Sequence, residues 1–382
     1  MHVLFLNSWY PNRNAPTLGN FVKKHAEAAA LFNTVSCLAI FPSDTIHSIE
    51  TVTNKENNLL EVVIYYPEVK NSIPGFSQWK KLNAYRAAFF KGLKIIQEER
   101  GKIDLTHLNV VYPLGIFALE LKKKRHIPFV VTEHSTAYHD PENKFSPRQL
   151  KLTKKVLRQA AMILPVSNDL GKAIARLAPN TPQRRVTNVV DPEKFVISNK
   201  KRMTFVHIST LDEAQKNPTG IIDVLAELKA ENVTVQIQFI SDFSYNHLKK
   251  YANDKGLTDH EITFAGPLKT EEVADVLKNA RALILFSNYE NFPCVIAEAF
   301  MSGVPVISTN VNGIPEYVNE TNGILIPPRQ NEALKNALKQ FIEKEYSFQQ
   351  KELRDYALTH FSYDAIGKAF NEVYIEVKNH VG

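Results

Sequence analysis

The chain has 382 residues, a formal net charge of +6 and two cysteines far apart in sequence, Cys37 and Cys294. A chain of this length is expected to form two domains, and its 44% hydrophobic and 23% charged residues exclude a disordered protein. The two distant cysteines exclude a disulfide framework and favour a reducing, cytoplasmic compartment, while the positive charge alone does not choose among anionic partners.

The first half of the chain alternates short apolar runs with amphipathic stretches. The opening run, residues 3–6, is too short for a signal peptide and suits a buried strand. Amphipathic helices are expected over residues 18–32 and 82–96. Further strands are expected at residues 35–40, 60–66, 105–108, 129–132 and 162–166. This alternation predicts a parallel, doubly wound sheet.

The second half repeats this order after a polar stretch at residues 188–199. Strands are expected at residues 204–208, 235–240, 262–265, 282–286 and 304–308, which predicts a second parallel sheet. We therefore predict an N-terminal domain over residues 1–190, a hinge over 191–202 and a C-terminal domain over 203–360. A helix over residues 361–382 is expected to pack back on the N-terminal domain.

An apolar stripe follows the predicted helix at residues 82–96. It contains Leu82, Tyr85, Phe89, Leu93 and Ile96, with Lys80, Lys81, Arg86, Lys91 and Lys94 beside it and Ile73, Phe76 and Trp79 before it. The pattern leaves two interpretations open. A basic amphipathic helix could rest on an anionic membrane, or the stripe could be the buried face of a helix that covers the sheet.

A second basic cluster, residues 122–125, follows the apolar run 114–121. It is therefore expected at a helix end, where cations complement the helix dipole. The other basic residues are dispersed, and no nucleic-acid-binding motif is present. Nucleic acid is therefore not an expected partner.

The strongest functional signal is a strand, loop and helix in the second half. They read RALILFS, NYENF and PCVIAEAFMSG, with a further strand VPVIST behind them. Pro293 suits the first helical turn and Gly303 the position just past the helix end. The N–H groups of Phe292, Cys294 and Val295 would then point from a helix N-terminus toward the carboxyl end of a strand. Doubly wound sheets bind anions such as a diphosphate at that place.

Two carboxylates flank this helix start, Glu290 in the loop before it and Glu298 within a helix of small or apolar residues. The pattern of Glu, seven residues and Glu, followed by Gly-Val-Pro-Val and Gly-Ile-Pro-Glu, resembles the donor-binding signature of the family 4 retaining glycosyltransferases. In that family the first Glu binds hydroxyls of the transferred sugar and the second binds the ribose of the nucleotide. The resemblance implies these roles for Glu290 and Glu298. We expect Glu290 in a surface cleft, where it adds little to packing.

The resemblance extends over most of the chain. HISTLDEAQKNP places Lys216 where the family has a Lys that neutralises the departing diphosphate, and Thr210 where the family has an Arg. TEHS implies that His134 faces the sugar. The implied catalytic residues are His134, Lys216 and Glu290. The implied donor-binding residues are Gly19, Asn20, Thr210, Asn291, Phe292, Pro293, Cys294, Val295 and Glu298.

The implied fold is α/β of the GT-B type, with two Rossmann-like, doubly wound parallel-sheet domains that face a central cleft. The implied reaction moves a hexose from a UDP- or GDP-sugar, with retention, to a glycan or lipid-linked glycan in cell-surface polysaccharide synthesis. It needs no metal or other cofactor, and the sequence has no Asp-x-Asp pair. The protein is expected in the cytoplasm, with peripheral contact at the inner face of the membrane.

Two other functions are compatible with these residues. Thr210 in place of Arg would also suit a nucleotide-sugar-binding protein with weakened catalysis. A nucleotide-sugar epimerase of the same fold would convert its donor without any acceptor. The residues do not distinguish among bases, sugars and acceptors.

Overall fold

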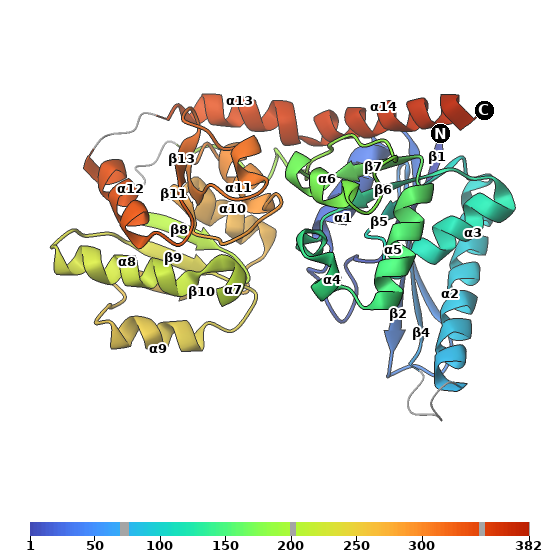
Figure 1. Ribbon diagram of the computed structural model, residues 1–382, viewed down its shortest axis with the longest axis horizontal. Coiled ribbons are helices and arrows are strands. Elements are labelled where there is room, and N and C mark those ends of the chain that lie inside the picture. Colours follow the sequence, from blue (N-terminus) through green and yellow to red (C-terminus); the bar gives the residue numbers. More distant parts are fainter. Residues whose placement is uncertain (69–75, 199–203, 344–347, 382) are drawn as a thin grey trace. The chain divides into compact units, whose positions relative to one another are not determined.

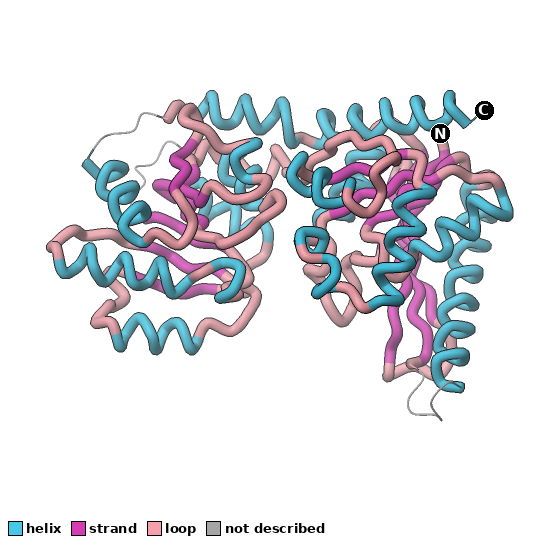
Figure 2. Tube along the Cα trace, viewed as in Figure 1, coloured by secondary structure: helices cyan, strands magenta, loops and turns pink. Residues whose placement is uncertain are grey.

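The computed structural model describes residues 1–68, 76–198, 204–343 and 348–381. The chain divides into two compact units (Figure 1). Unit 1 comprises Met1–Val166, Leu170–Thr187 and Tyr363–Gly382, and unit 2 comprises Ser167–Asp169 and Asn188–Ser362. In both units the strands lie between helices (Figure 2). The predicted α/β class with two parallel sheets is confirmed. Residues 199–202 of the predicted hinge lie outside the described residues.

The sheet of unit 1 has the strand order β3-β4-β2-β1-β5-β6-β7. Its strands are β1 His2–Asn7, β2 Thr34–Ser43, β3 Glu50–Glu56, β4 Leu59–Pro67, β5 Leu105–Asn109, β6 Phe129–Glu133 and β7 Met162–Pro165. Their pairings are parallel except for the hairpin of β3 and β4. β3 was not expected from the sequence, because this edge strand is polar and mostly exposed and has no apolar alternation.

The helices of unit 1 cover both faces of this sheet. They are α1 Asn20–Ala30, α2 Phe76–Arg100, α3 Gly115–Arg125, α4 Pro141–Lys144, α5 Pro147–Gln159, α6 Asn168–Ala175, which begins in unit 2, and α14 Tyr363–Val381. α14 lies against α1, where Tyr363 donates a hydrogen bond of 2.7 Å to Glu27. A side chain at Gly367 would stand 2.4 Å from the carbonyl oxygen of Ala28, so this close contact requires glycine.

The apolar stripe at residues 82–96 is largely the buried face of α2. Phe89, Leu93 and Ile96 are buried, and the Phe89 ring stacks on Phe117 of α3 with centroids 3.8 Å apart. The membrane-binding interpretation is therefore wrong for the part of the stripe beyond Leu82, because the rings of Tyr85 and Phe89 contact Phe117 of α3 and Tyr85 also contacts Tyr66 of β4.

The beginning of α2 differs from the rest of this helix. Trp79 is 60% exposed and Leu82 is 44% exposed, and the neighbouring Lys80 and Lys81 are also exposed. Ile73 lies outside the described residues. The described part of the chain has no helix with both the length and the apolar content to cross a bilayer.

Unit 2 contains a six-stranded parallel sheet of order β10-β9-β8-β11-β12-β13. Its strands are β8 Thr204–Ile208, β9 Ile237–Ile240, β10 Ile262–Ala265, β11 Ala280–Leu285, β12 Val306–Thr309 and β13 Gly323–Ile326. Its helices are α7 Glu213–Lys216, α8 Pro218–Ala230, α9 Asn246–Asp254, α10 Thr270–Lys278, α11 Cys294–Met301, α12 Asn331–Glu343 and α13 Gln350–Phe361. A core of aliphatic and aromatic side chains joins sheet and helices. Parallel pairing brings the carboxyl ends of β8, β11 and β12 to one edge.

The stacked ring of Phe89 gives a stability prediction. Phe89→Ala should lower the free energy of unfolding of unit 1 by about 3 to 5 kcal/mol, because it leaves a cavity beside Phe117. Phe90→Ala is the matched control, since Phe90 is 38% exposed, and it should cost about 1 kcal/mol or less. Both tryptophans, Trp9 and Trp79, belong to unit 1, so urea unfolding followed by tryptophan fluorescence reports on this unit. Equal losses in the two variants would contradict the stacked arrangement.

Candidate functional site

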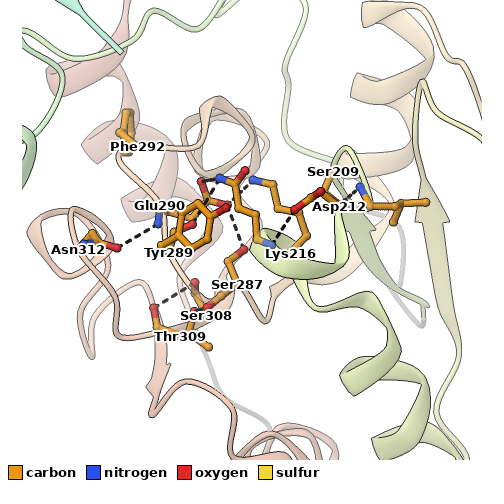
Figure 3. A network of polar contacts seen from close by, with 12 residues as sticks. Ser209, Asp212, Lys216, Ser287, Tyr289, Glu290, Phe292, Ser308, Thr309 and Asn312 are labelled. Atoms are coloured by element: carbon orange, nitrogen blue, oxygen red, sulfur yellow. Dashed lines mark hydrogen bonds and ion pairs between the residues drawn. The ribbon is translucent and has the colours of Figure 1, made fainter. Parts of the chain in front are cut away.

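Glu290 is the centre of a polar network in unit 2 (Figure 3). It lies in the loop between β11 and α11, and only 5% of the residue is exposed. Ser287 Oγ donates to Glu290 Oε1 at 3.0 Å, and Gln215 Nε2 donates to Oε2 at 3.3 Å. Lys216 Nζ forms an ion pair with Oε1. Both carboxylate oxygens therefore have partners within the protein.

The loop that carries Glu290 is fixed by the loop that follows β12. The backbone N–H of Glu290 donates to Asn312 Oδ1 at 3.2 Å, and the N–H of Gly313 donates to the carbonyl oxygen of Glu290 at 3.3 Å. A side chain at Gly313 would stand 2.0 Å from the carbonyl oxygen of Asn291. Glycine is needed here because the two loops approach so closely.

Lys216 is the last residue of the short helix α7. Asp212 caps this helix by accepting a hydrogen bond of 2.8 Å from the N–H of Gln215. Asn217 ends it in the left-handed conformation, with φ of 51°. The cap and the end residue together direct Gln215 and Lys216 toward Glu290. Thr210, by contrast, is exposed in the loop between β8 and α7.

The environment of Glu290 corrects one expectation and adds residues that were not predicted. Glu290 was expected in a surface cleft with little part in packing, but it is buried and ion-paired, because a buried carboxylate needs such partners. Gln215, Ser287 and Asn312 were not named from the sequence. Ser287 and Asn312 stand shortly after the apolar strands β11 and β12, which is the only sequence signal for them, and Gln215 has none.

The start of α11 presents backbone rather than long side chains. Pro293 caps the helix with extended backbone, and the helix begins at Cys294, so Pro293 lies one position earlier than expected. The residues on either side, Asn291 and Val295, are buried. Glu298 lies further along α11 and is half-buried. The N-terminal N–H groups can bind an anion, and the Glu298 carboxylate, one turn further along the helix, can accept hydrogen bonds from hydroxyl groups.

Phe292 anchors the entrance to α11. Its buried ring lies 4.1 Å from that of Tyr317 and 5.1 Å from that of Phe361, measured between centroids. Its carbonyl oxygen accepts a hydrogen bond of 3.0 Å from Asn188 Nδ2. The Phe292 side chain therefore fixes the helix start and leaves only its backbone for ligand binding.

His134 directly follows β6 in unit 1. Its ring lies 4.4 Å from that of Phe21 and 5.4 Å from that of His25. Desolvation, together with the neighbouring histidines, holds the pKa of His134 well below its ordinary value. Burial lowers the pKa of His25 to about 4, and its Nε2 donates to the carbonyl oxygen of Thr187 at 2.9 Å. Both rings are therefore neutral near pH 7.

The start of α1 lies beside this histidine pair. Gly19 precedes the helix with φ of 67°, and a side chain there would stand 2.6 Å from the backbone of Trp9. Asn20 begins the helix and is exposed. Phe21, which was not predicted as a site residue, brings this helix start next to His134. Unit 1 therefore gathers Gly19, Asn20 and His134, while unit 2 gathers Lys216, Glu290 and the start of α11.

Among the residues that the structure describes, no group of three or more His, Cys, Asp or Glu side chains could hold a metal ion.

Two family models match successive parts of the chain. The model described as Glycosyltransferase Family 4 matches residues 46–194. The model described as Glycosyl transferases group 1 matches residues 191–359. The second match includes Lys216, Glu290 and Glu298, and the first includes His134.

Comparisons of the whole chain agree with these models. The putative teichuronic acid biosynthesis glycosyltransferase TuaC of Bacillus subtilis is 23% identical over 361 residues, which is 89% of each chain. The structure of sucrose-phosphate synthase from Thermosynechococcus elongatus matches with a TM-score of 0.79 at 18% identity, covering 100% of both chains. Anabaena HepE in complex with UDP matches with a TM-score of 0.73 at 18% identity, over 98% of this chain and 100% of that one. The structural matches establish the fold.

The buried ion pair can be tested without any substrate. Lys216→Met and Glu290→Gln should each lower the free energy of unfolding of unit 2 by about 3 kcal/mol, because each leaves a buried partner uncompensated. The double variant should lose less than the sum, with a coupling energy of about 1 to 3 kcal/mol. Differential scanning calorimetry of the four proteins measures these losses. The exposed pair Lys194 and Glu271 is the control, and its neutralisation should show a coupling below about 0.5 kcal/mol. Additive losses for Lys216 and Glu290 would show that they do not interact.

Proposed function

The chain belongs to the family 4 glycosyltransferases, the glycosyl transferases group 1 with the GT-B fold, and from this premise we propose that it transfers a hexose with retention to a glycan or lipid-linked glycan. Nucleotide-sugar-dependent transfer follows from the family. Retention, the hexose, the acceptor and the residue roles form the proposal. The observation that carries it is the buried pair of Lys216 and Glu290 beside the start of α11.

Glu290 has the chemistry to hold the transferred sugar. An ionised carboxylate only accepts hydrogen bonds and has about four lone-pair sites. Ser287, Gln215 and Lys216 approach its two oxygens, and this fixes the direction in which the group faces. Hydroxyls of a sugar would then donate to a carboxylate whose position is set before the donor arrives.

Lys216 and the start of α11 have the chemistry to hold the leaving group. In the proposed reaction, the acceptor hydroxyl oxygen bonds to the anomeric carbon while the bond from that carbon to the diphosphate oxygen breaks. Negative charge grows on the diphosphate, which takes up the proton of the acceptor hydroxyl. The ammonium of Lys216 and the helix N–H groups would stabilise that charge. Glu298 would accept hydrogen bonds from the ribose. This assignment leaves no step that calls for a metal ion.

His134 would face the sugar from unit 1. Because its pKa is held well below the ordinary value, the imidazole is neutral at pH 7 and offers one donor and one acceptor nitrogen. The proposed transfer requires unit 1 and unit 2 to approach each other about a hinge near residues 191–199, since His134 and Glu290 belong to different units. Gly19 and Asn20 would approach the phosphates from the start of α1.

Similar proteins support a UDP-linked donor and a role in cell-surface polysaccharide synthesis. HepE was solved with UDP, which supports a UDP-linked donor for this chain. The similarity to TuaC supports cell-surface polysaccharide synthesis. We further propose cytoplasmic location with peripheral contact at the inner membrane face through Trp79 and Leu82, whose exposed rings and methyl groups stand beside exposed lysines.

The assignment of Glu290 is tested by transfer from UDP-glucose and GDP-mannose to a panel of glycan acceptors. Glu290→Gln should lower the turnover number at least about 100-fold at a temperature where the variant stays folded, because the amide replaces a charged acceptor of sugar hydroxyls. The control is Glu320→Gln, an exposed carboxylate of unit 2, which should transfer normally. Near-normal turnover in Glu290→Gln would remove the assignment. Isomerised donor without acceptor would indicate an epimerase, and donor binding without any product would indicate a binding protein.

The position of Thr210 gives a second kinetic prediction. Lys216→Ala should lower turnover about 100- to 1,000-fold and weaken donor binding less, because the ammonium matters most when charge develops on the leaving phosphate. Adding Thr210→Arg should recover part of the rate, since it supplies a guanidinium where relatives carry one. Steady-state kinetics of the two variants, with donor affinity from calorimetric titration, measures this. A double variant that binds donor normally and recovers nothing would contradict the role of position 210.

A further inference from the structure

A basic cavity of about 690 Å³ opens on the outer side of α5 in unit 1. It has the size of typical ligand sites, which range from about 300 to 1,000 Å³. Its walls contain one carboxylate, Glu142, and four cations, Lys151, Lys154, Lys155 and Arg158. The cavity therefore favours an anionic occupant.

The helix that builds this wall has an unusual charge pattern. α5 contains Arg148 as well as the four cations of the cavity, and its sequence PRQLKLTKKVLRQ contains no acidic residue. Like charges one turn apart destabilise a helix. Lys151 and Lys155 are such a pair, both are exposed, and neither forms an ion pair with the described residues. Their repulsion is slightly unfavourable for folding, and an anionic ligand between them would relieve it.

The other cations of the wall are held in place. Arg158 Nε donates to the carbonyl oxygen of Leu177 at 2.9 Å, and Lys154 lies 3.7 Å from Glu142. Arg158 and Lys154 are therefore held in position before a ligand binds, while Lys151 and Lys155 remain available to a ligand. Along α5, residues 151 to 158 span about 10 Å, so the cations form a row rather than a single point of charge.

The cavity is connected to the loop that carries His134. Phe145 lines the cavity, and its ring lies 5.3 Å from that of Tyr138. The Tyr138 hydroxyl donates to Glu133 Oε1 at 2.7 Å, and Glu133 directly precedes His134. A ligand against Phe145 is therefore linked to the segment before His134 through Tyr138 and Glu133.

A soluble polyanion fits this cavity better than a membrane surface does. A helix that lies on a bilayer directs apolar side chains at the lipid, but Leu150, Val156 and Leu157 of α5 are buried in unit 1. The large apolar side chains that the structure exposes do not include any from α4 or α5. A row of cations in a concave wall instead matches a chain with negative charges at intervals.

We propose that this cavity binds an acidic segment of the acceptor glycan, a run of carboxylate-bearing sugars, and that the enzyme extends a polyanionic chain. The proposal rests on the proposed transferase function and specifies the acceptor class for it. Lys151, Lys155 and Arg158 contact the carboxylates, and Phe145 lies against a sugar ring.

The test uses the full chain and a short oligogalacturonide, an oligomer of uronic acid, with its methyl-esterified form as the uncharged control. Calorimetric titration should show at least about tenfold tighter binding of the acidic oligomer, because only this form offers carboxylates to the cations. Lys151→Glu combined with Lys155→Glu should remove that preference. The matched control is Lys249→Glu combined with Lys250→Glu on α9 of unit 2, which exchanges two exposed lysines and should bind as the wild type does.

Three results would overturn the proposal. The first is equal binding of the acidic and esterified oligomers, and the second is an acidic preference that survives in the α5 variant. The third is that the protein binds phosphatidylglycerol vesicles but not oligogalacturonide and that the α5 variant loses the vesicle binding, which would identify the cavity as a membrane contact. UDP titration of the same proteins distinguishes a failure of the proposed acceptor site from a failure of the transferase assignment. The α5 variant should keep its UDP affinity, because the residues assigned to the donor in unit 2 are unchanged.

Discussion

The buried ion pair of Lys216 and Glu290 is the constraint on which the rest of the site depends. Moving an ionised carboxylate out of water costs several kcal/mol, and nearby opposite charge and hydrogen bonds offset this only when their geometry is good. Ser287 and Gln215 complete that geometry. The cap on α7 positions Lys216, and the close contact at Gly313 between the loops after β11 and β12 positions Glu290. Both features therefore hold the ion pair together. The same groups therefore serve folding and, in the proposed reaction, ligand binding. A diphosphate and a sugar would have to offer Lys216 and Glu290 interactions comparable to those that they already make.

The sequence allows the apolar framework to be predicted better than the polar network. Buried parallel strands such as β1 and β6 are continuous apolar runs, so they are visible without a structure. β13 was not expected, and α7 is too short for any helical periodicity to appear. Gln215 meets Glu290 across 75 positions of sequence, and nothing local marks that contact. Glu290 itself was found through resemblance to a family, which indicates its role but does not indicate how deeply it is buried.

Periodicity shows that a helix has an apolar face without showing what covers that face. The stripe on α2 illustrates this, because Phe89 and Leu93 would look the same beneath a membrane or against a protein core. The contact that distinguishes these two environments is made by Phe117, which lies on another helix, α3. Histidines are equally ambiguous in sequence. His25 and His134 are far apart along the chain, yet their rings lie 5.4 Å apart, and their low pKa values result from that shared, desolvated environment.

The net charge of +6 does not identify an anionic partner, but the placement of the cations separates two kinds of basic site. The Lys216 side chain is only 12% exposed and is already paired, so dissolved salt screens it little. Lys151 and Lys155 are exposed, and at an ionic strength of about 0.15 M charges more than about 8 Å apart are largely screened from each other. A ligand of the first site is therefore selected by geometry and desolvation, whereas a ligand of the second is selected by the number and spacing of its charges. This difference suits a compact diphosphate at Lys216 and an extended acidic chain at α5.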